Sequence, residues 1–145
     1  MLMSSSTALP SSLGTGHAGI DHDHEELMAL CQSLPQTLDD ELPAAFHALH
    51  TRFAAHFAQE DALMAQQDFS SRQCHLDEHA AVLQSFEDVG AALREGRMDP
   101  ARRMGAALID WLPEHIDALD RHLAKFMFYQ QTGGAPVLIR RPGRA

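Results

Sequence analysis

The chain has 145 residues and a mass of 16.0 kDa, which is long enough for one domain with its own hydrophobic core. Its 11 basic and 20 acidic residues give a formal net charge of −9. This argues against nucleic acid and anionic membranes as partners, because Lys and Arg carry binding to both. The sequence has no apolar run long enough to span a membrane, no signal-peptide pattern and only two cysteines, so we expect a cytoplasmic protein.

The N-terminal part of the sequence passes from an irregular segment into a helix. Residues 1–19 contain no Asp, Glu, Lys or Arg and are rich in Ser, Gly and Thr, which predicts an irregular N-terminal arm. A first helix is predicted over residues 21–38, because apolar residues recur there at spacings of three and four. The residues of this apolar stripe are Leu27, Leu30, Cys31, Leu34 and Leu38.

Two further helices are predicted in the middle of the chain. The second helix covers residues 43–67, with Pro43 suited to its first turn. Ser70 and Gln73 have the spacing of a capping box, so they are expected to start a third helix that stops near Gly96. The apolar stripe of the second helix begins with Phe46, Leu49 and Phe53.

A fourth helix is predicted to begin at the pair Asp99–Pro100, which suits an N-cap and first helical position. Pro113 lies inside this helix, where its missing N–H favours a kink. Residues 133–145 hold three arginines and two prolines and are expected to form a flexible basic C-terminal tail. Four helices with short connections predict an all-α fold, an up-down-up-down four-helix bundle over residues 20–132.

Histidine is unusually frequent, with ten residues beside a single lysine, Lys125. When each apolar stripe is continued at helical spacing, it reaches polar residues in every helix. Counting from the shared loops at about 1.5 Å per residue places these residues within about one turn of the same height. Several polar groups in one core need a shared partner, because unpaired ones are destabilising. The residues reached in this way are His24, His56, Glu60, His75, His79 and His115.

These spacings predict a metal site in the core of the bundle. His56 and Glu60 are four residues apart, as are His75 and His79, so each pair lies on one helix face. Imidazole and carboxylate together suit iron, zinc, manganese, copper or nickel better than magnesium or calcium. The set is too large for one ion, so we expect two ions bridged by carboxylates.

A further carboxylate from the fourth helix is expected, and the spacing leaves a choice between Asp117 and Asp120. Asp120 follows His115 by five residues, which is about 140° around an ideal helix. Bringing both side chains to one site therefore requires a local distortion such as a π-bulge.

The runs that carry these residues resemble the hemerythrin family, bacterial hemerythrins in particular, over about residues 19–127. The resemblance implies a non-haem di-iron centre that binds O2 reversibly. It implies that His24 and His56 ligate the iron with the open site, and that Glu60 and Asp120 bridge the two irons together with an oxo or hydroxo group. It assigns the other iron to His75, His79 and His115. The matching runs are GIDHDHEEL (19–27), HFAQEDALM (56–64), HLDEH (75–79) and DWLPEHIDALD (110–120).

The sequence also suggests which residues face the bound gas. Leu27, Trp111, Leu112 and Ile116 lie within a turn of the expected ligands, and we expect them to form a dry O2 pocket. O2 or another small diatomic molecule is the expected partner, in an oxygen carrier, store or donor rather than an enzyme. A sensor of O2, NO or peroxide, and an iron-handling or peroxidase-type protein, stay open as alternatives. The sequence names no protein partner.

Overall fold

The computed structural model describes residues 14–67 and 71–131 of the chain, and every regular element within them is helical. Residues 14–17 precede the first helix without regular structure. None of the helices in this part is long and apolar enough to cross a membrane. The elements are α1 (Ala18–Ser33), η2 (Leu34–Gln36), α2 (Leu42–Gln67), α3 (Arg72–Arg94), α4 (Asp99–His115), η3 (Ile116–Asp120) and α5 (Arg121–Gln131).

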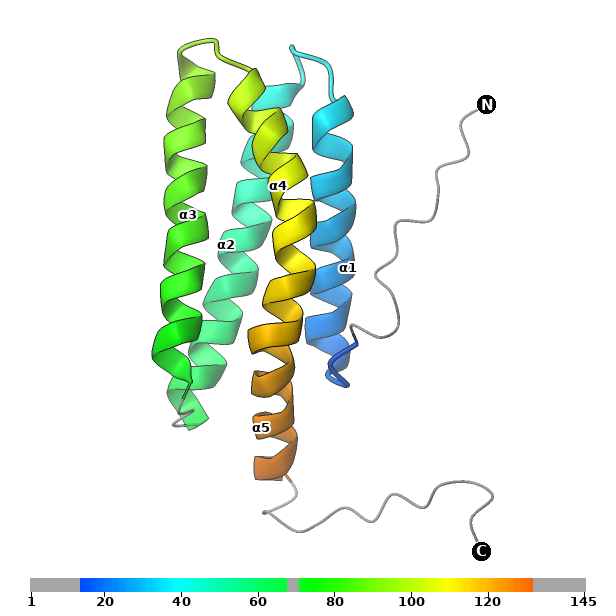
Figure 1. The fold of residues 1–145 in the computed structure, drawn as a ribbon, viewed down its shortest axis with the longest axis vertical. Coiled ribbons are helices and arrows are strands. Elements are labelled where there is room, and N and C mark those ends of the chain that lie inside the picture. Colours follow the sequence, from blue (N-terminus) through cyan, green and yellow to red (C-terminus); the bar gives the residue numbers. More distant parts are fainter. Residues whose placement is uncertain (1–13, 68–70, 132–145) are drawn as a thin grey trace, which may run out of the picture.

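The helices run alternately up and down, as the sequence predicted. Figure 1 shows α1 and α3 running in one direction and α2 in the other, with α4, η3 and α5 forming one long antiparallel rod. Helix α2 contacts α1 and α3, and α4 also contacts both of these helices. The bundle therefore has four helical columns around a common core, which are α1, α2, α3 and the rod formed by α4, η3 and α5. The expected four-helix bundle is therefore confirmed.

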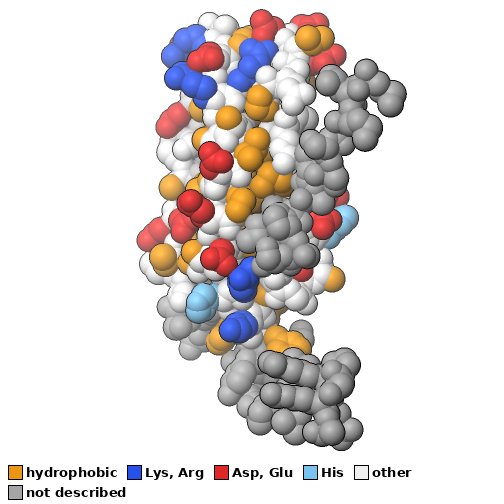
Figure 2. Space-filling model, turned by 45° about the vertical axis from the view of Figure 1, so that its right-hand side comes forward, with side chains coloured by type: hydrophobic (Ala, Val, Ile, Leu, Met, Phe, Trp, Pro, Cys, Tyr) orange, Lys and Arg blue, Asp and Glu red, His pale blue; other side chains and the backbone are white. Residues whose placement is uncertain are grey.

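Two apolar clusters lie on either side of a polar layer. The larger cluster fills the end of the bundle where α1 connects to α2 and α3 connects to α4, and includes Phe53, Phe57 and Phe86. The smaller cluster lies beyond the polar layer and is built on Met64, Leu123 and Met127. Figure 2 shows basic side chains at the end of the bundle that holds the larger cluster, with acidic side chains beside them.

The start and end of the first helix differ from the expected range of 21–38. The helix begins at Ala18 because His17 caps it, with the His17 Nδ1 accepting a hydrogen bond from the Ile20 N–H at 3.2 Å. The α-helix then ends at Ser33 and tightens into the 3₁₀ turn η2. Leu38 was expected to continue the apolar stripe, but it lies beyond that turn and is 66% exposed.

The starts of α3 and α4 differ from the expected signals. Ser70 of the predicted capping box lies outside the described residues; the N-cap of α3 is Ser71, and the side chain of Gln73 donates to Asp77 Oδ1 at 2.8 Å. Met98, not Asp99, is the N-cap of α4. Asp99 lies in the first helical turn, where it pairs with the side chain of Arg103.

The fourth column carries the distortion that the sequence suggested. Helix α4 contains Pro113 and ends at His115, and the five residues Ile116–Asp120 form a π-turn before α5 continues. The third helix ends near Gly96 as predicted, and this glycine adopts a φ of +83°, a conformation that favours glycine. The C-terminal tail, 133–145, and most of the N-terminal arm lie outside the described residues.

Candidate metal centre

All seven predicted ligand residues are buried together in the polar layer. Each of them is at most 4% exposed, which is unusual for charged side chains unless they have partners. Every column of the bundle contributes to the layer. The residues are His24 from α1, His56 and Glu60 from α2, His75 and His79 from α3, His115 from α4 and Asp120 from η3.

The π-turn decides which aspartate of the fourth column reaches the layer. A π-turn adds a residue to the helical turn, so side chains five residues apart come onto one face. As a result His115 Nε2 lies 3.0 Å from Asp120 Oδ1. Asp117 instead points to solvent and pairs with Arg121 at 2.9 Å. The structure thus places Asp120 with the histidines and Asp117 away from them.

The seven side chains form two overlapping groups whose potential ligand atoms lie within 4.8 Å of one another. His24 and His56 define the two-histidine half. His75, His79 and His115 define the three-histidine half. Both halves include the same two carboxylates, Glu60 and Asp120.

Each of the two carboxylates presents one oxygen to each half. Asp120 Oδ2 lies 2.7 Å from His24 Nε2, whereas Oδ1 lies 2.7 Å from His75 Nε2. Glu60 Oε2 lies 3.4 Å from His56 Nε2, whereas Oε1 lies 3.2 Å from His79 Nε2. This is the arrangement that two bridging carboxylates need.

Several of the converging atoms have no hydrogen-bond partner among the described residues. Both Glu60 oxygens are in this state, as are the Nε2 atoms of His56, His79 and His115. Buried polar atoms without partners are strongly unfavourable, and here they all face one small volume. Their chemistry, imidazole nitrogen with carboxylate oxygen, is that of a transition-metal site. The residues present therefore fit a pair of metal ions.

Three more carboxylates each contact the Nδ1 atom of one histidine, on the side of the ring that faces away from the cluster. We call these nitrogens the outer nitrogens and these acids the outer carboxylates. Asp23 Oδ2 accepts from His56 Nδ1 at 3.0 Å. Asp61 lies 2.8 Å from His79 Nδ1, and Glu78 lies 3.0 Å from His115 Nδ1. Such contacts place the proton on Nδ1, so that the Nε2 lone pair is directed into the cluster.

Sequence reasoning missed these outer carboxylates, although each one is adjacent to a predicted ligand in the chain. Asp23 precedes His24, Asp61 follows Glu60, and Glu78 precedes His79. In every case the acid binds a histidine on the next column of the bundle rather than its own neighbour: α1 to α2, α2 to α3, and α3 to α4. An acid beside each ligand was the available signal.

The pKa values of the layer follow from burial and from these contacts. Burial lowers the pKa of an imidazole, but the nearby carboxylates of Glu60 and Asp23 outweigh it and raise the pKa of His56 from 6.5 to about 9. Against the same burial, Asp120 and Glu60 raise the pKa of His75 to about 9. Burial raises the pKa of a carboxyl, yet the surrounding histidines hold the pKa values of Glu60 and Asp120 below their ordinary range.

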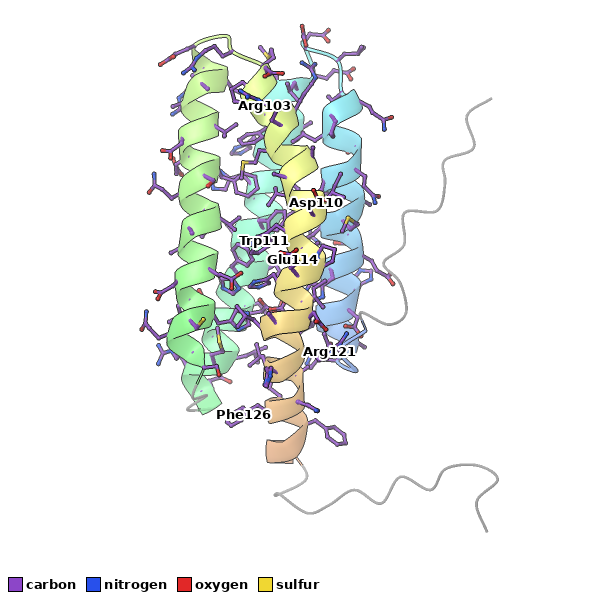
Figure 3. The ribbon with its side chains drawn as sticks, in the orientation of Figure 1. Arg103, Asp110, Trp111, Glu114, Arg121 and Phe126 are labelled. Carbon is purple, nitrogen blue, oxygen red and sulfur yellow. The ribbon has the colours of Figure 1, made fainter. Side chains whose placement is uncertain are left out.

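The four residues expected to line the O2 pocket take two different positions. Leu27, Leu112 and Ile116 are buried in the large apolar cluster, and Leu27 also borders a cavity of about 110 Å³ that reaches His56. Trp111 points from α4 into the bundle (Figure 3) and its ring stacks on His115, with ring centroids 4.4 Å apart. Trp111 therefore adjoins the three-histidine half.

An all-helical bundle that buries histidines and carboxylates at one level defines a metal-binding helical protein. Comparison with known proteins identifies its family. The sequence model described as "Hemerythrin HHE cation binding domain" matches residues 15–127, so the chain belongs to the hemerythrin family. A protein named "Bacteriohemerythrin" from Ralstonia nicotianae (strain ATCC BAA-1114 / GMI1000) is 28% identical over 116 residues, which cover 80% of this chain and 85% of that protein. No solved structure shows a significant match.

Proposed function

We propose that the polar layer holds two iron ions and that the protein binds O2 reversibly, as an oxygen carrier, store or donor. The observation that carries this proposal is that Glu60 and Asp120 each present one oxygen to each half of the cluster. Membership of the hemerythrin family and the similarity to a bacteriohemerythrin support it. The nitrogen ligands would be His24 and His56 for one ion and His75, His79 and His115 for the other.

The two halves would have different roles. When bound, the iron pair supplies two electrons and a free coordination position for O2, with an oxo or hydroxo group completing the bridge. The two-histidine half offers four protein side chains and the three-histidine half five, so the free position belongs to the two-histidine half. Leu27, Leu112 and Ile116 would exclude water from it, which keeps charged species from leaving.

The other residues of the layer favour binding over catalysis. The outer carboxylates Asp23, Asp61 and Glu78 each hold a histidine proton. Among the described residues, the buried charged side chains are the seven of the cluster. No additional buried acid or base in this part of the chain stands ready for proton transfer.

Anaerobic loading with ferrous iron tests this function. We expect two irons per chain, a charge-transfer absorption that develops with O2, and its reversal when O2 is removed. Asp120→Asn should lose both the iron and the absorption. Asp117→Asn is the matched control, because it changes an exposed aspartate three residues away. Fewer than two metals per chain, native zinc or manganese, or an unchanged spectrum with O2 would contradict the proposal.

A further inference from the structure

A groove of about 360 Å³ lies between the start of α2 and the end of α3, on the side of the large apolar cluster. Its floor contains Phe46 and Phe86, whose ring centroids are 5.3 Å apart. The ring of His50 stacks on Phe86, with centroids 4.8 Å apart and an interplanar angle of 4°. Phe46 and Phe86 are only 3% and 0% exposed, so the partly exposed ring of His50 is the aromatic surface that a flat ligand in the groove would meet.

The groove also carries a cation without a counterion. Arg94 lines it, and in the described part of the chain Arg94 has no ion pair, whereas nearby Arg97, Arg102 and Arg103 are each paired with a carboxylate. A Cβ placed on Gly90 would lie 3.6 Å from Arg94 Nη1, so the guanidinium extends over the floor. His47 and His50 line the groove as well.

One acid moderates this charge at the other end of the groove. Glu87 is two helical turns from Arg94 along α3 and lies 4.0 Å from His50 Nε2. The end near Arg94 therefore favours an anion, even though the whole chain has a net charge of −9. A ligand with a flat ring and an anionic group at one end matches both features.

A path of packed rings leads from the groove floor to the metal cluster. The centroid of Phe86 lies 5.4 Å from that of Phe53, which lies 6.4 Å from that of Trp111. Trp111 then stacks on His115. A second branch passes from Phe53 to Phe57 at 5.5 Å, and Phe57 stacks on His79 at 3.9 Å.

Both branches of this ring path end on the three-histidine half. The cluster residues are at most 4% exposed, and the cavity beside His56 has a volume of only about 110 Å³. A reductant larger than a few atoms thus has no direct contact with the cluster. Electrons that restore oxidised iron must cross protein, and the packed rings give a continuous route.

We propose that this α2–α3 groove binds reduced flavin mononucleotide, or a reductant of the same chemistry, and passes its electrons to the three-histidine half. The isoalloxazine ring lies on the exposed face of His50, whose other face stacks on Phe86, and the phosphate lies at Arg94. The reduced ring gives up two electrons and two protons to become the oxidised ring. The electrons convert two ferric ions to two ferrous ions, and the protons enter the water at the open face of the groove.

The part of this proposal that concerns electrons rests on the proposed function, so its first test uses metal-free protein. Oxidised flavin mononucleotide is titrated and its fluorescence quenching is followed. We expect saturable binding that weakens roughly tenfold or more in Arg94→Glu, because a charge-assisted contact is lost and a repulsion is added. Gly90→Leu should also weaken binding, because its side chain fills the groove.

Arg72→Glu is the matched control for the titration. Arg72 is exposed at the opposite end of α3, and in the described residues it has no ion pair either, so the charge change is the same. Its affinity for flavin should equal that of the unmodified chain. The proposal would be overturned if the unmodified chain did not bind flavin, or if Arg94→Glu and Gly90→Leu bound it as tightly as the unmodified chain does.

The second test follows the reduction of air-oxidised, iron-loaded protein. Reduced flavin mononucleotide should reduce Arg94→Glu and Gly90→Leu several-fold more slowly than the unmodified chain and Arg72→Glu. Dithionite, which needs no groove, should reduce all four at the same rate. Equal rates with the flavin would refute electron delivery through the groove. Failure to load iron would refute the proposed function instead, and the titration of metal-free protein would still be interpretable.

Discussion

The two halves of the buried cluster share their carboxylates but differ in the aromatic rings that stack on their histidines. In the three-histidine half, Phe57 stacks on His79 and Trp111 stacks on His115, and each of these histidines also has an outer carboxylate. In the two-histidine half, His56 contacts the outer carboxylate of Asp23. Each half also has one histidine, His24 or His75, whose Nδ1 is buried with no partner among the described residues.

The two halves also differ in their surroundings. The cavity beside His56 reaches the two-histidine half, whereas the ring path from the α2–α3 groove ends on the three-histidine half. This difference indicates a division of labour within one layer of side chains. On the proposed function, the three-histidine half would hold its ion among stacked rings, and the two-histidine half would leave room for a small ligand.

The largest effect is expected when a residue common to both halves is changed. Glu60→Gln removes a negative charge and one metal-binding oxygen that face the two halves, so iron content should fall from two per chain to less than one. Metal analysis after anaerobic loading measures this change. Circular dichroism should show that the helical fold is kept. Retention of both irons would mean that Glu60 does not bridge them.

The next effect separates the halves from each other. Asp61→Asn and Glu78→Gln should weaken metal binding to the three-histidine half, and Asp23→Asn to the two-histidine half, each by about 10–100-fold. Stepwise titration with Co²⁺, followed by its visible absorption, resolves the two events. Asp77→Asn is the control, because Asp77 is exposed beside Glu78 and contacts Gln73. Equal weakening of both binding steps in all three variants would show that the outer carboxylates do not act on separate halves of the cluster.

A smaller effect concerns the pH dependence of the metal-free protein. The raised pKa values of His56 and His75 contribute stability below about pH 6.5 that is lost as the pH rises through about 9. The lowered pKa values of Glu60 and Asp120 contribute stability above their ordinary values of 4.5 and 3.8 that is lost in acid. Metal-free protein should therefore be most stable near pH 5–6.5.

Thermal melts between pH 4 and 9 measure this profile. From pH 6.5 to 9 the Tm of the metal-free protein should fall by ~5 °C or more. The metal-loaded protein should not show this fall, because the metal replaces the protons. A flat profile without metal would show that these histidines do not carry a second proton in the folded state.

Much of the fold was predictable from the sequence because helical periodicity is a local property. Apolar residues such as Phe46, Leu49 and Phe53 recur at spacings of three and four and are buried as expected. The ends of the helices were less predictable. Leu38 fitted the periodicity, but the α-helix ends at Ser33, and the residue is exposed. Helix ends depend on capping contacts and on the neighbouring helix, and the spacing of apolar residues along one helix does not show either of these.

The sequence by itself determined that six polar side chains share one level of the core. Helix rise and loop position fix height, and both can be read along the chain. Only the tertiary structure decided how these side chains meet. The π-turn selects Asp120 over Asp117, and each outer carboxylate binds a histidine on the next column. The physical reason is that helix rotation and contacts between columns are set by packing of the whole bundle, whereas spacing along one helix is set by its backbone.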